Sequence, residues 1–238
     1  MMKKLIWIVS FIPLIGTALV LQFMPDSVPM HYDSAGNIDR LGSKYENLIF
    51  PIIILAMTLL WALFIGYYEK KADRANDEKE SAGARTNAKV IGIVGLSVTV
   101  MFTVMQGFIL YGAYTGAVSG AERQTVDIGK VSCILLGVVL ILLGNFMTKT
   151  RINGVAGFRI SWSMYNDNTW RKSNRFGAFA IMVAGVLTII TAVLMKNSFI
   201  ATMVMLGYIL IASVMTVIYS HRVYVRERES ENKGEQSL

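Results

Sequence analysis

The residues best suited to bind a partner lie in one stretch, residues 152–177, which separates two long apolar runs. Guanidinium, indole and asparagine amide groups are concentrated there, and glycines stand near both ends. Arginine binds carboxylates and phosphates through paired hydrogen bonds, and indole rings favour the membrane–water boundary. A turn between helices needs only a few residues, so this length indicates more than a turn. The candidate binding residues are Asn153, Gly157, Arg159, Trp162, Trp170, Arg171, Asn174 and Arg175.

Plain anchoring is the alternative interpretation of this stretch, because aromatic rings and long cationic side chains flank many membrane spans. Anchoring alone requires neither Asn153 nor Asn174, and it does not require the glycines at positions 154, 157 and 177. The residues themselves leave both interpretations open.

A second polar stretch, residues 25–47, offers the candidate binding residues His31, Asp33, Gly36, Asp39 and Lys44. An imidazole and two carboxylates can ligate a metal ion. On a turn, however, such groups more often bond the backbone and one another, and the D-x-[DN]-x-[DN]-G spacing of a calcium loop is absent. We therefore assign neither a metal nor a cofactor. Two prolines and the turn-forming residues 33–37 favour a hairpin or cap over the helix ends.

The elements that position both stretches are membrane spans. The chain has 238 residues, is 54% hydrophobic and only 16% charged, and has a mean hydropathy of +0.49, which lies outside the range of soluble proteins. Six apolar runs are long enough to cross a bilayer as helices: 5–24, 48–68, 90–114, 128–147, 176–195 and 198–220. The expected fold is an all-α integral membrane bundle of six transmembrane helices.

The basic residues predict the orientation of these spans. With the N-terminus inside, 18 of the 23 Lys and Arg fall in cytoplasmic segments, and the five others are Arg40, Lys44, Arg123, Lys130 and Lys196. This bias follows the positive-inside rule, so both termini and residues 148–176 are expected in the cytoplasm, and residues 25–47 outside. The net charge of +7 then reflects topology and contact with anionic lipids, and no direct nucleic-acid binding is expected.

Local patterns add finer expectations. Phe158, Trp162 and Tyr165 would share one face of an interfacial helix. The sequence Asn166-Asp167-Asn168-Thr169 is typical of a helix start, and that helix would continue into the fifth span with Arg171 and Arg175 side by side. The charged segment 69–89 is expected to be a solvated linker or a helical extension of the second span. Cys133, the one cysteine, falls inside the fourth span and is expected to be a buried free thiol.

Both polar stretches resemble a known family. The run PDSVPMHYDSAGNIDRLGSK, residues 25–44, resembles the signature of a two-span module of unknown function that often begins members of the SdpI family. The second signature of that family resembles the residues Asn153, Gly157-Phe158-Arg159, Trp162, Trp170-Arg171-Lys172 and Asn174-Arg175-Phe176-Gly177. The chain departs from it at Ser161-Trp162-Ser163, where a Thr-Pro-Trp-Thr type of sequence is expected.

The resemblance implies a division of the chain and a function. Residues 1–89 would form the two-span module, 90–125 the third span with a short outer loop, 126–222 the SdpI-like three-span module, and 223–238 a flexible charged tail. Members of this family are multi-pass immunity proteins of the bacterial plasma membrane. They protect the cell against a secreted membrane-active peptide toxin, and one holds a transcriptional repressor at the membrane. A toxin outside and a repressor inside are therefore the implied partners, beside membrane lipids.

A small membrane transporter, or a membrane enzyme acting on a lipid or peptide, is the alternative. The spans carry few ionisable groups, which disfavours ion-coupled transport. The sequence has no metalloprotease, P-loop, G-x-S-x-G or C-x-x-C motif, so no nucleophile–base pair can be named and no enzyme is expected. Because each half holds three spans with a polar stretch after the first, an inverted repeat of residues 1–116 and 117–220 is a further hypothesis.

Overall fold

Six long helices dominate the computed structural model, which describes residues 2–148, 152, 155 and 157–235. The helices are α1 (Met2–Val20), α2 (Ile49–Arg74), α3 (Glu78–Ser119), α4 (Ile128–Met147), α5 (Asp167–Leu194) and α6 (Ser198–Glu235). All six are long and apolar enough to cross a membrane. Two strands, β1 (Ser27–Tyr32) and β2 (Ile38–Ser43), and a short 3-10 helix, η1 (Lys44–Leu48), connect α1 to α2. The predicted all-α membrane bundle is confirmed.

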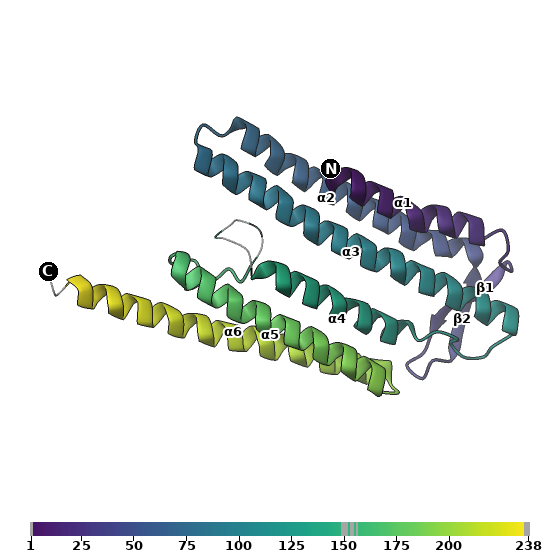
Figure 1. The fold of residues 1–238 in the computed structure, drawn as a ribbon. Coiled ribbons are helices and arrows are strands. Elements are labelled where there is room, and N and C mark those ends of the chain that lie inside the picture. Colours follow the sequence, from purple (N-terminus) through teal and green to yellow (C-terminus); the bar gives the residue numbers. More distant parts are fainter. Residues whose placement is uncertain (1, 149–151, 153–154, 156, 236–238) are drawn as a thin grey trace.

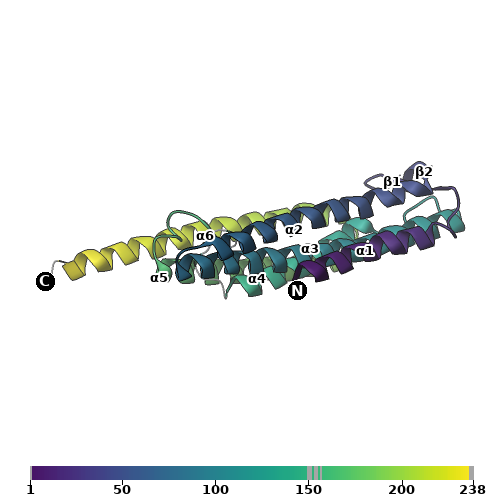
Figure 2. The same cartoon turned by 90° about the horizontal axis from the view of Figure 1, so that it is seen from above.

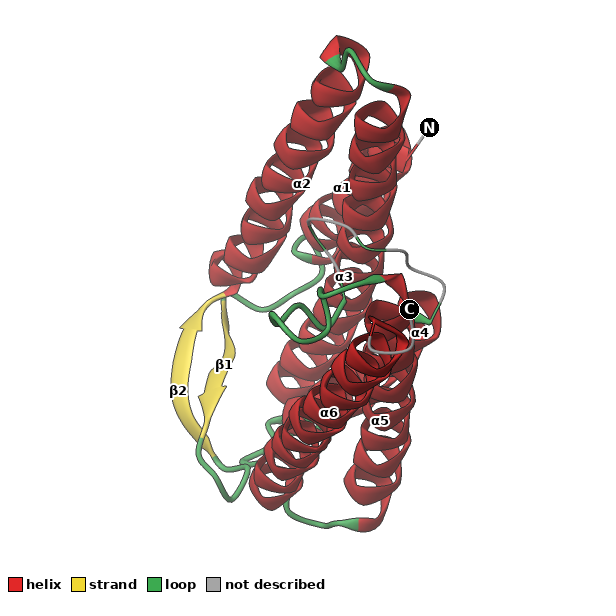
Figure 3. Cartoon of the chain, turned by 90° about the vertical axis from the view of Figure 1, so that its left-hand side faces the viewer, coloured by secondary structure: helices red, strands yellow, loops and turns green. Residues whose placement is uncertain are grey.

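The helices form two groups of three, as Figures 1 and 3 show. In the first group α1, α2 and α3 all pack against one another, and in the second α5 packs against both α4 and α6. The groups meet mainly where α3 contacts α4. Each group thus has three spans, as the repeat hypothesis requires, while the inverted repeat itself stays a prediction.

The connections between consecutive helices lie at two opposite ends of the bundle. The β1–β2 hairpin lies at the same end as the α3–α4 and α5–α6 connections, and the α2–α3 connection and the C-terminus lie at the other end (Figures 1 and 2). We call the hairpin end the outer end and the opposite end the inner end, following the charge-based prediction of orientation. Which end faces the cytoplasm remains a prediction.

The charged segment 69–89 is almost entirely helical. It extends α2 to Arg74 and lets α3 begin at Glu78, so the two helices continue together beyond their apolar parts. Ion pairs join Lys71 to Glu80 and Lys3 to Glu69 at this inner end. The helical alternative for this segment is thus confirmed.

A proline inside α1 is accommodated by α3. Pro13 has no N–H, so the carbonyl oxygen of Val9, one turn earlier, lacks its usual helical partner. The hydroxyl of Thr103 lies 3.4 Å from that oxygen and 2.8 Å from the carbonyl oxygen of Thr99, so its one proton is shared between them. A backbone group freed inside a membrane span is in this way partly satisfied by a neighbouring helix.

Glycines bring α4 and α5 into close contact. A Cβ atom added to Gly137 would lie 2.8 Å from the carbonyl oxygen of Gly185, and one added to Gly185 would lie 2.7 Å from the carbonyl oxygen of Gly137. Only glycine therefore fits at either position. This close backbone approach is typical of membrane helix pairs. Cys133, which lies on α4, is a buried free thiol, as predicted.

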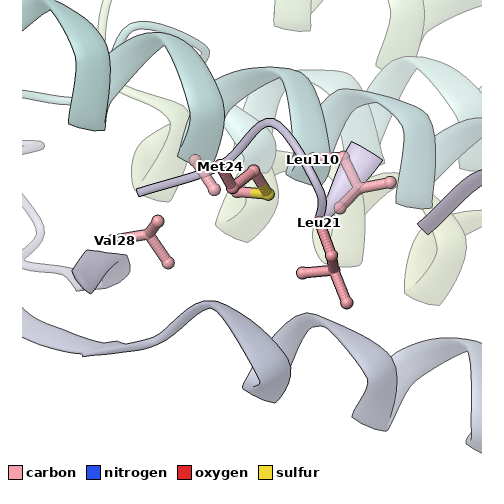
Figure 4. Close-up of a cluster of buried hydrophobic side chains, with 5 residues drawn as sticks. Leu21, Met24, Val28 and Leu110 are labelled. Carbon is pink, nitrogen blue, oxygen red and sulfur yellow. The ribbon is translucent and has the colours of Figure 1, made fainter. Parts of the chain in front are cut away.

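The hairpin is joined to the bundle by an apolar cluster at the outer end. Leu21 and Met24, which follow α1, pack with Val28 of β1 and with Leu110 and Ala113 of α3 (Figure 4). Val28 is completely buried. This cluster fixes the hairpin against α3 and so positions the outer polar residues.

Candidate functional site

The outer motif is a β-hairpin whose turn is organised by Asp33, which confirms the predicted hairpin. Asp33 Oδ1 accepts hydrogen bonds from the backbone N–H groups of Ala35 and Asn37, both at 2.8 Å, and Oδ2 accepts one from the Asn37 amide. These bonds lower the pKa of Asp33, the Asn37 side chain contributing most. Gly36 has a φ of 82°, a left-handed conformation that favours glycine. Asp33 and Gly36 thus shape the turn.

His31 and Asp39 face each other across the hairpin. The imidazole Nδ1 lies 2.6 Å from Asp39 Oδ1. The oxygens of Asp33 point into the turn, and no group of three His, Cys, Asp or Glu suited to a metal ion occurs within the described residues. Of the three side chains considered as metal ligands, His31 and Asp39 therefore form a pair, whereas Asp33 accepts the hydrogen bonds of the hairpin turn.

Lys44 joins the end of the hairpin to the end of α1. Its ammonium group donates to the carbonyl oxygen of Met24 at 3.3 Å and pairs with Asp26 at 3.0 Å. Next to it, Ser43 and Glu46 form a reciprocal capping box at the start of η1. Arg40 binds the Glu46 carboxylate and is the main cause of its lowered pKa. Lys44 thus has a structural role in the hairpin.

The hairpin turn also binds the connection between α3 and α4. The Gln124 N–H donates to the carbonyl oxygen of Gly36 at 2.8 Å, and the Ile38 N–H donates to that of Glu122 at 2.9 Å. Arg123 Nε donates to Asn37 Oδ1 at 2.9 Å. The pair of Asn37 and Arg123 was not predicted, because the two residues are 86 positions apart and Arg123 lies outside both motifs. The outer motif therefore contacts the linker between the two helix groups.

The inner motif begins with the predicted start of α5. Asn166 caps this helix, and its side chain and that of Thr169 form a reciprocal capping box. α5 then runs from Asp167 to Leu194 without a break. Arg171 and Arg175 both lie on its first turns, as their four-residue spacing predicts, and both are exposed.

Trp170 and Asn174 support the chain that precedes α5. Both side chains are about 1% exposed. Asn174 Oδ1 accepts a hydrogen bond from the Phe158 N–H at 2.7 Å, and its amide donates to the carbonyl oxygen of Trp170 at 3.1 Å. Gly157 has a φ of 116°, and a Cβ atom there would lie 2.6 Å from Asn174 Oδ1 and 2.9 Å from the Trp170 ring. Three motif residues thus form one folded core.

The predicted interfacial helix through Phe158, Trp162 and Tyr165 is wrong. Residues 157–166 form bends and a single turn, closed by a hydrogen bond from Met164 N–H to the carbonyl oxygen of Ile160. The buried hydroxyl of Ser163 lies 2.6 Å from the Phe158 carbonyl oxygen and 2.9 Å from that of Ile160, and it accepts from the Ile160 N–H. A side chain that satisfies these backbone groups replaces the helical ladder.

The inner extension of α6 holds this turn from the other side. Glu227 accepts hydrogen bonds from the amides of Asn166, at 3.3 Å, and Asn168, at 2.6 Å. Glu231 accepts one from the Tyr165 hydroxyl at 2.6 Å, which raises the pKa of that phenol. Residues 223–238 were predicted to be a flexible charged tail, whereas α6 continues as a helix to Glu235 and its acidic side chains make these contacts. The acidic residues Glu227 and Glu231, which lie among the basic residues of this segment, were the signal in the sequence that could have indicated these contacts.

The predicted inner residues fall into two sets. Gly157, Trp170 and Asn174 support the fold of the turn. The Trp162 ring packs edge to face with the His221 ring, and the two ring centroids are 4.5 Å apart. Arg159, Arg171 and Arg175 are exposed, and no salt bridge of theirs is found among the described residues. Asn153 lies outside the described residues. We call Arg159, Arg171 and Arg175 the inner arginine set.

Two family models match separate segments of the chain. Residues 149–220 match the SdpI/YfhL protein family, and residues 8–55 match a domain of unknown function, DUF1648. Residues 149–220 are an SdpI-family segment. The SdpI match covers the connection before α5, α5 itself and the apolar part of α6, which is the part of the chain whose motif resembles that family.

A curated relative extends this similarity beyond the SdpI segment. The chain is 20% identical to the Immunity protein SdpI of Bacillus subtilis (strain 168) over 225 residues, which is 94% of this chain and 97% of the relative. No solved structure matches the chain. The six helices and this similarity support a multi-pass protein of the bacterial plasma membrane.

Proposed function

We propose that this chain is a membrane immunity protein that protects the cell against a secreted membrane-active peptide toxin. The observation that carries the proposal is its similarity to the Immunity protein SdpI along almost the whole length of both chains. The match includes the outer hairpin and the inner turn, so both polar motifs are available for the same role. We propose no enzymatic activity.

The arrangement of the outer end supports this function. A toxin secreted into the medium reaches the outer surface first, and there the hairpin is fixed to α3 by an apolar cluster and to the α3–α4 connection by backbone hydrogen bonds. An ordered surface loses little conformational entropy when it binds, which favours recognition. The hairpin is accordingly the proposed outer contact for the toxin.

Survival of cells tests the proposal. A strain that lacks the gene should be killed by at least one peptide in a panel of secreted membrane-active peptides, and expression of this chain should restore growth. The proposal fails if no peptide in the panel is counteracted. Peptide or lipid turnover, or substrate uptake, by the purified protein in proteoliposomes would favour the transporter or enzyme alternative instead.

The inner arginine set supports a second step, the retention of a repressor protein at the membrane. Arg159, Arg171 and Arg175 present exposed guanidinium groups. Hydrogen bonds to Asn174 and to Glu227 join the turn that precedes α5 to α5 and α6. Guanidinium groups bind carboxylates in pairs of hydrogen bonds. The repressor would therefore present an acidic surface to this end of the bundle.

Co-purification of a repressor tests this step. The double substitution Arg159→Ala and Arg175→Ala should abolish capture of an adjacent-operon repressor from toxin-treated cells. The matched control is Arg74→Ala with Lys79→Ala, which removes the same charge from exposed positions around the α2–α3 connection. Unchanged capture by the first pair, with normal membrane insertion, would contradict the assignment.

A further inference from the structure

A cavity of about 490 Å³ opens at the outer end between the two helix groups. Its walls come from the hairpin, from α3, and from the first turns of α4 and α6. Apolar side chains such as Met30, Ile109, Val126 and Phe199 form much of the lining. A site of this size holds a few side chains of a ligand.

One wall of the cavity is formed by β1. Pro29, Met30, His31 and Tyr32 are consecutive residues of this strand, and all four line the cavity. The pairing of β1 with β2 is irregular between Pro29 and Tyr32, and such an irregularity breaks the strict alternation of side chains between the two faces of a strand. Consecutive residues of β1 can therefore line the same cavity.

A buried acceptor without a partner also lines this cavity. Asn47 is about 2% exposed, and its Oδ1 has no hydrogen-bond partner within the described residues. Its amide group is already used, because it donates to the carbonyl oxygen of Lys44 at 3.0 Å. A buried acceptor left unpaired is unfavourable, so an N–H donor from a ligand would be favoured there.

The charges around the cavity indicate the sign of the ligand. The ionisable groups that line it are Asp33, Asp127, His31 and Tyr32, and no Lys or Arg does so in the part of the chain that the structure describes. Both carboxylates already accept backbone hydrogen bonds, in the hairpin turn and at the start of α4. They therefore act through their negative field, which favours a cationic ligand.

We infer that the outer cavity binds a segment of a cationic peptide, which donates an N–H to Asn47 Oδ1 and places an apolar side chain among Met30, Ile109 and Phe199. Binding of this kind takes affinity from the apolar lining and specificity from the few polar groups that fix the orientation of the ligand. The inference rests on the proposed immunity function and assigns the toxin to this site.

Photo-crosslinking tests the location directly. A benzophenone amino acid in place of Phe199 should crosslink to the peptide that the protein counteracts in the survival test, added to the full chain in lipid nanodiscs. The matched control is the same replacement of Phe23, which is also exposed at the outer end but does not line the cavity. Equal peptide crosslinking at both positions, or crosslinking at Phe199 to phospholipid alone, would overturn the inference.

Filling the cavity gives an independent test. A Cβ atom on Gly112 would lie 3.5 Å from Val126, an ordinary contact, so Gly112→Leu directs its larger side chain into the cavity. Gly107→Leu is the control, because Gly107 is on the same helix, lies outside the lining of this cavity and has open space around it. We expect at least tenfold weaker binding of the fluorescently labelled peptide, and loss of protection, for Gly112→Leu only.

The outcomes separate the two proposals. If the unmodified chain gives no protection against any peptide, the immunity function fails and the site assignment falls with it. If the unmodified chain protects while Gly112→Leu, inserted at normal levels, binds the peptide and protects equally well, the immunity function stands and the cavity assignment is wrong.

Discussion

The backbone N–H of Phe158 donates a hydrogen bond to the side-chain oxygen of Asn174 at 2.7 Å, and this bond fixes the inner turn to the first turns of α5. The Asn174 side chain is about 1% exposed and also donates to the carbonyl oxygen of Trp170. It therefore satisfies two backbone groups at once, in a place where water does not reach.

Replacement of Asn174 should loosen the turn. Asn174→Ala leaves the Phe158 N–H without its partner, and an unsatisfied buried donor costs about 1–3 kcal/mol. We expect a lower thermal unfolding midpoint in detergent and faster tryptic cleavage after Arg159. Asn76→Ala, at an exposed position in the α2–α3 connection, is the control and should change neither measurement. Normal cleavage of the Asn174→Ala protein would show that the bond does not order the turn.

A methyl group at Gly157 should have a comparable effect for a different reason. Gly157→Ala forces a side chain into a φ of 116° and places its Cβ 2.6 Å from Asn174 Oδ1. Backbone strain of this kind costs about 1–3 kcal/mol. Gly207→Ala in α6 is the matched control, because its Cβ meets nothing within 4 Å. Unfolding measured in detergent should separate the two variants, and equal stabilities would contradict the predicted strain.

The order of the outer turn should depend on pH through Asp33. Its pKa in the folded chain is lowered from the ordinary value of 3.8, chiefly by the Asn37 amide. The ionised carboxylate therefore stabilises the turn fully above pH 3.8, and this contribution is lost as the pH falls through the lowered pKa. Hydrogen exchange of the Ala35 and Asn37 amides, corrected for intrinsic rates, should show protection that declines in that range.

The substitution Asp33→Asn supplies the control for this titration. An asparagine in its place does not ionise, so the protection of the Ala35 and Asn37 amides should become independent of pH below 5. A decline that persists unchanged in Asp33→Asn would assign the effect to another carboxylate, and Glu46, whose pKa Arg40 lowers, would be the next to replace.

Gln106 should be required for stability in the first helix group. Its Nε2 donates to Thr17 Oγ1 at 3.0 Å and to the carbonyl oxygen of Asn47 at 3.1 Å, joining α3 to α1 and to η1. Gln106→Met keeps the volume and leaves both acceptors unpaired, at a cost of about 1–3 kcal/mol. Asn145→Leu, at an exposed position of α4, should unfold like the unmodified chain. Thermal unfolding in mild detergent measures the midpoints of both variants. Equal midpoints for Gln106→Met and Asn145→Leu would show that Gln106 does not stabilise the first helix group.

The sequence by itself determined the six spans, the hairpin and the start of α5. Each depends on short-range rules: run length against bilayer thickness, turn chemistry at residues 33–37, and the capping preference of Asn166. These rules need no knowledge of distant residues. The charge bias likewise predicts an orientation from composition alone. The first and last residues of the spans were less well predicted, because α2, α3 and α6 continue as helices into charged segments.

Only the tertiary structure decided which motif residues support the fold and which remain exposed. Trp170 and Arg171 are neighbours in the sequence, yet one is buried under the inner turn and the other faces outward, because one face of α5 packs against that turn. The pairing of Asn37 with Arg123 and the support of Asn166 by Glu227 join residues far apart in the chain. The outer cavity exists for the same reason: its walls meet only when the hairpin, α3, α4 and α6 are folded together.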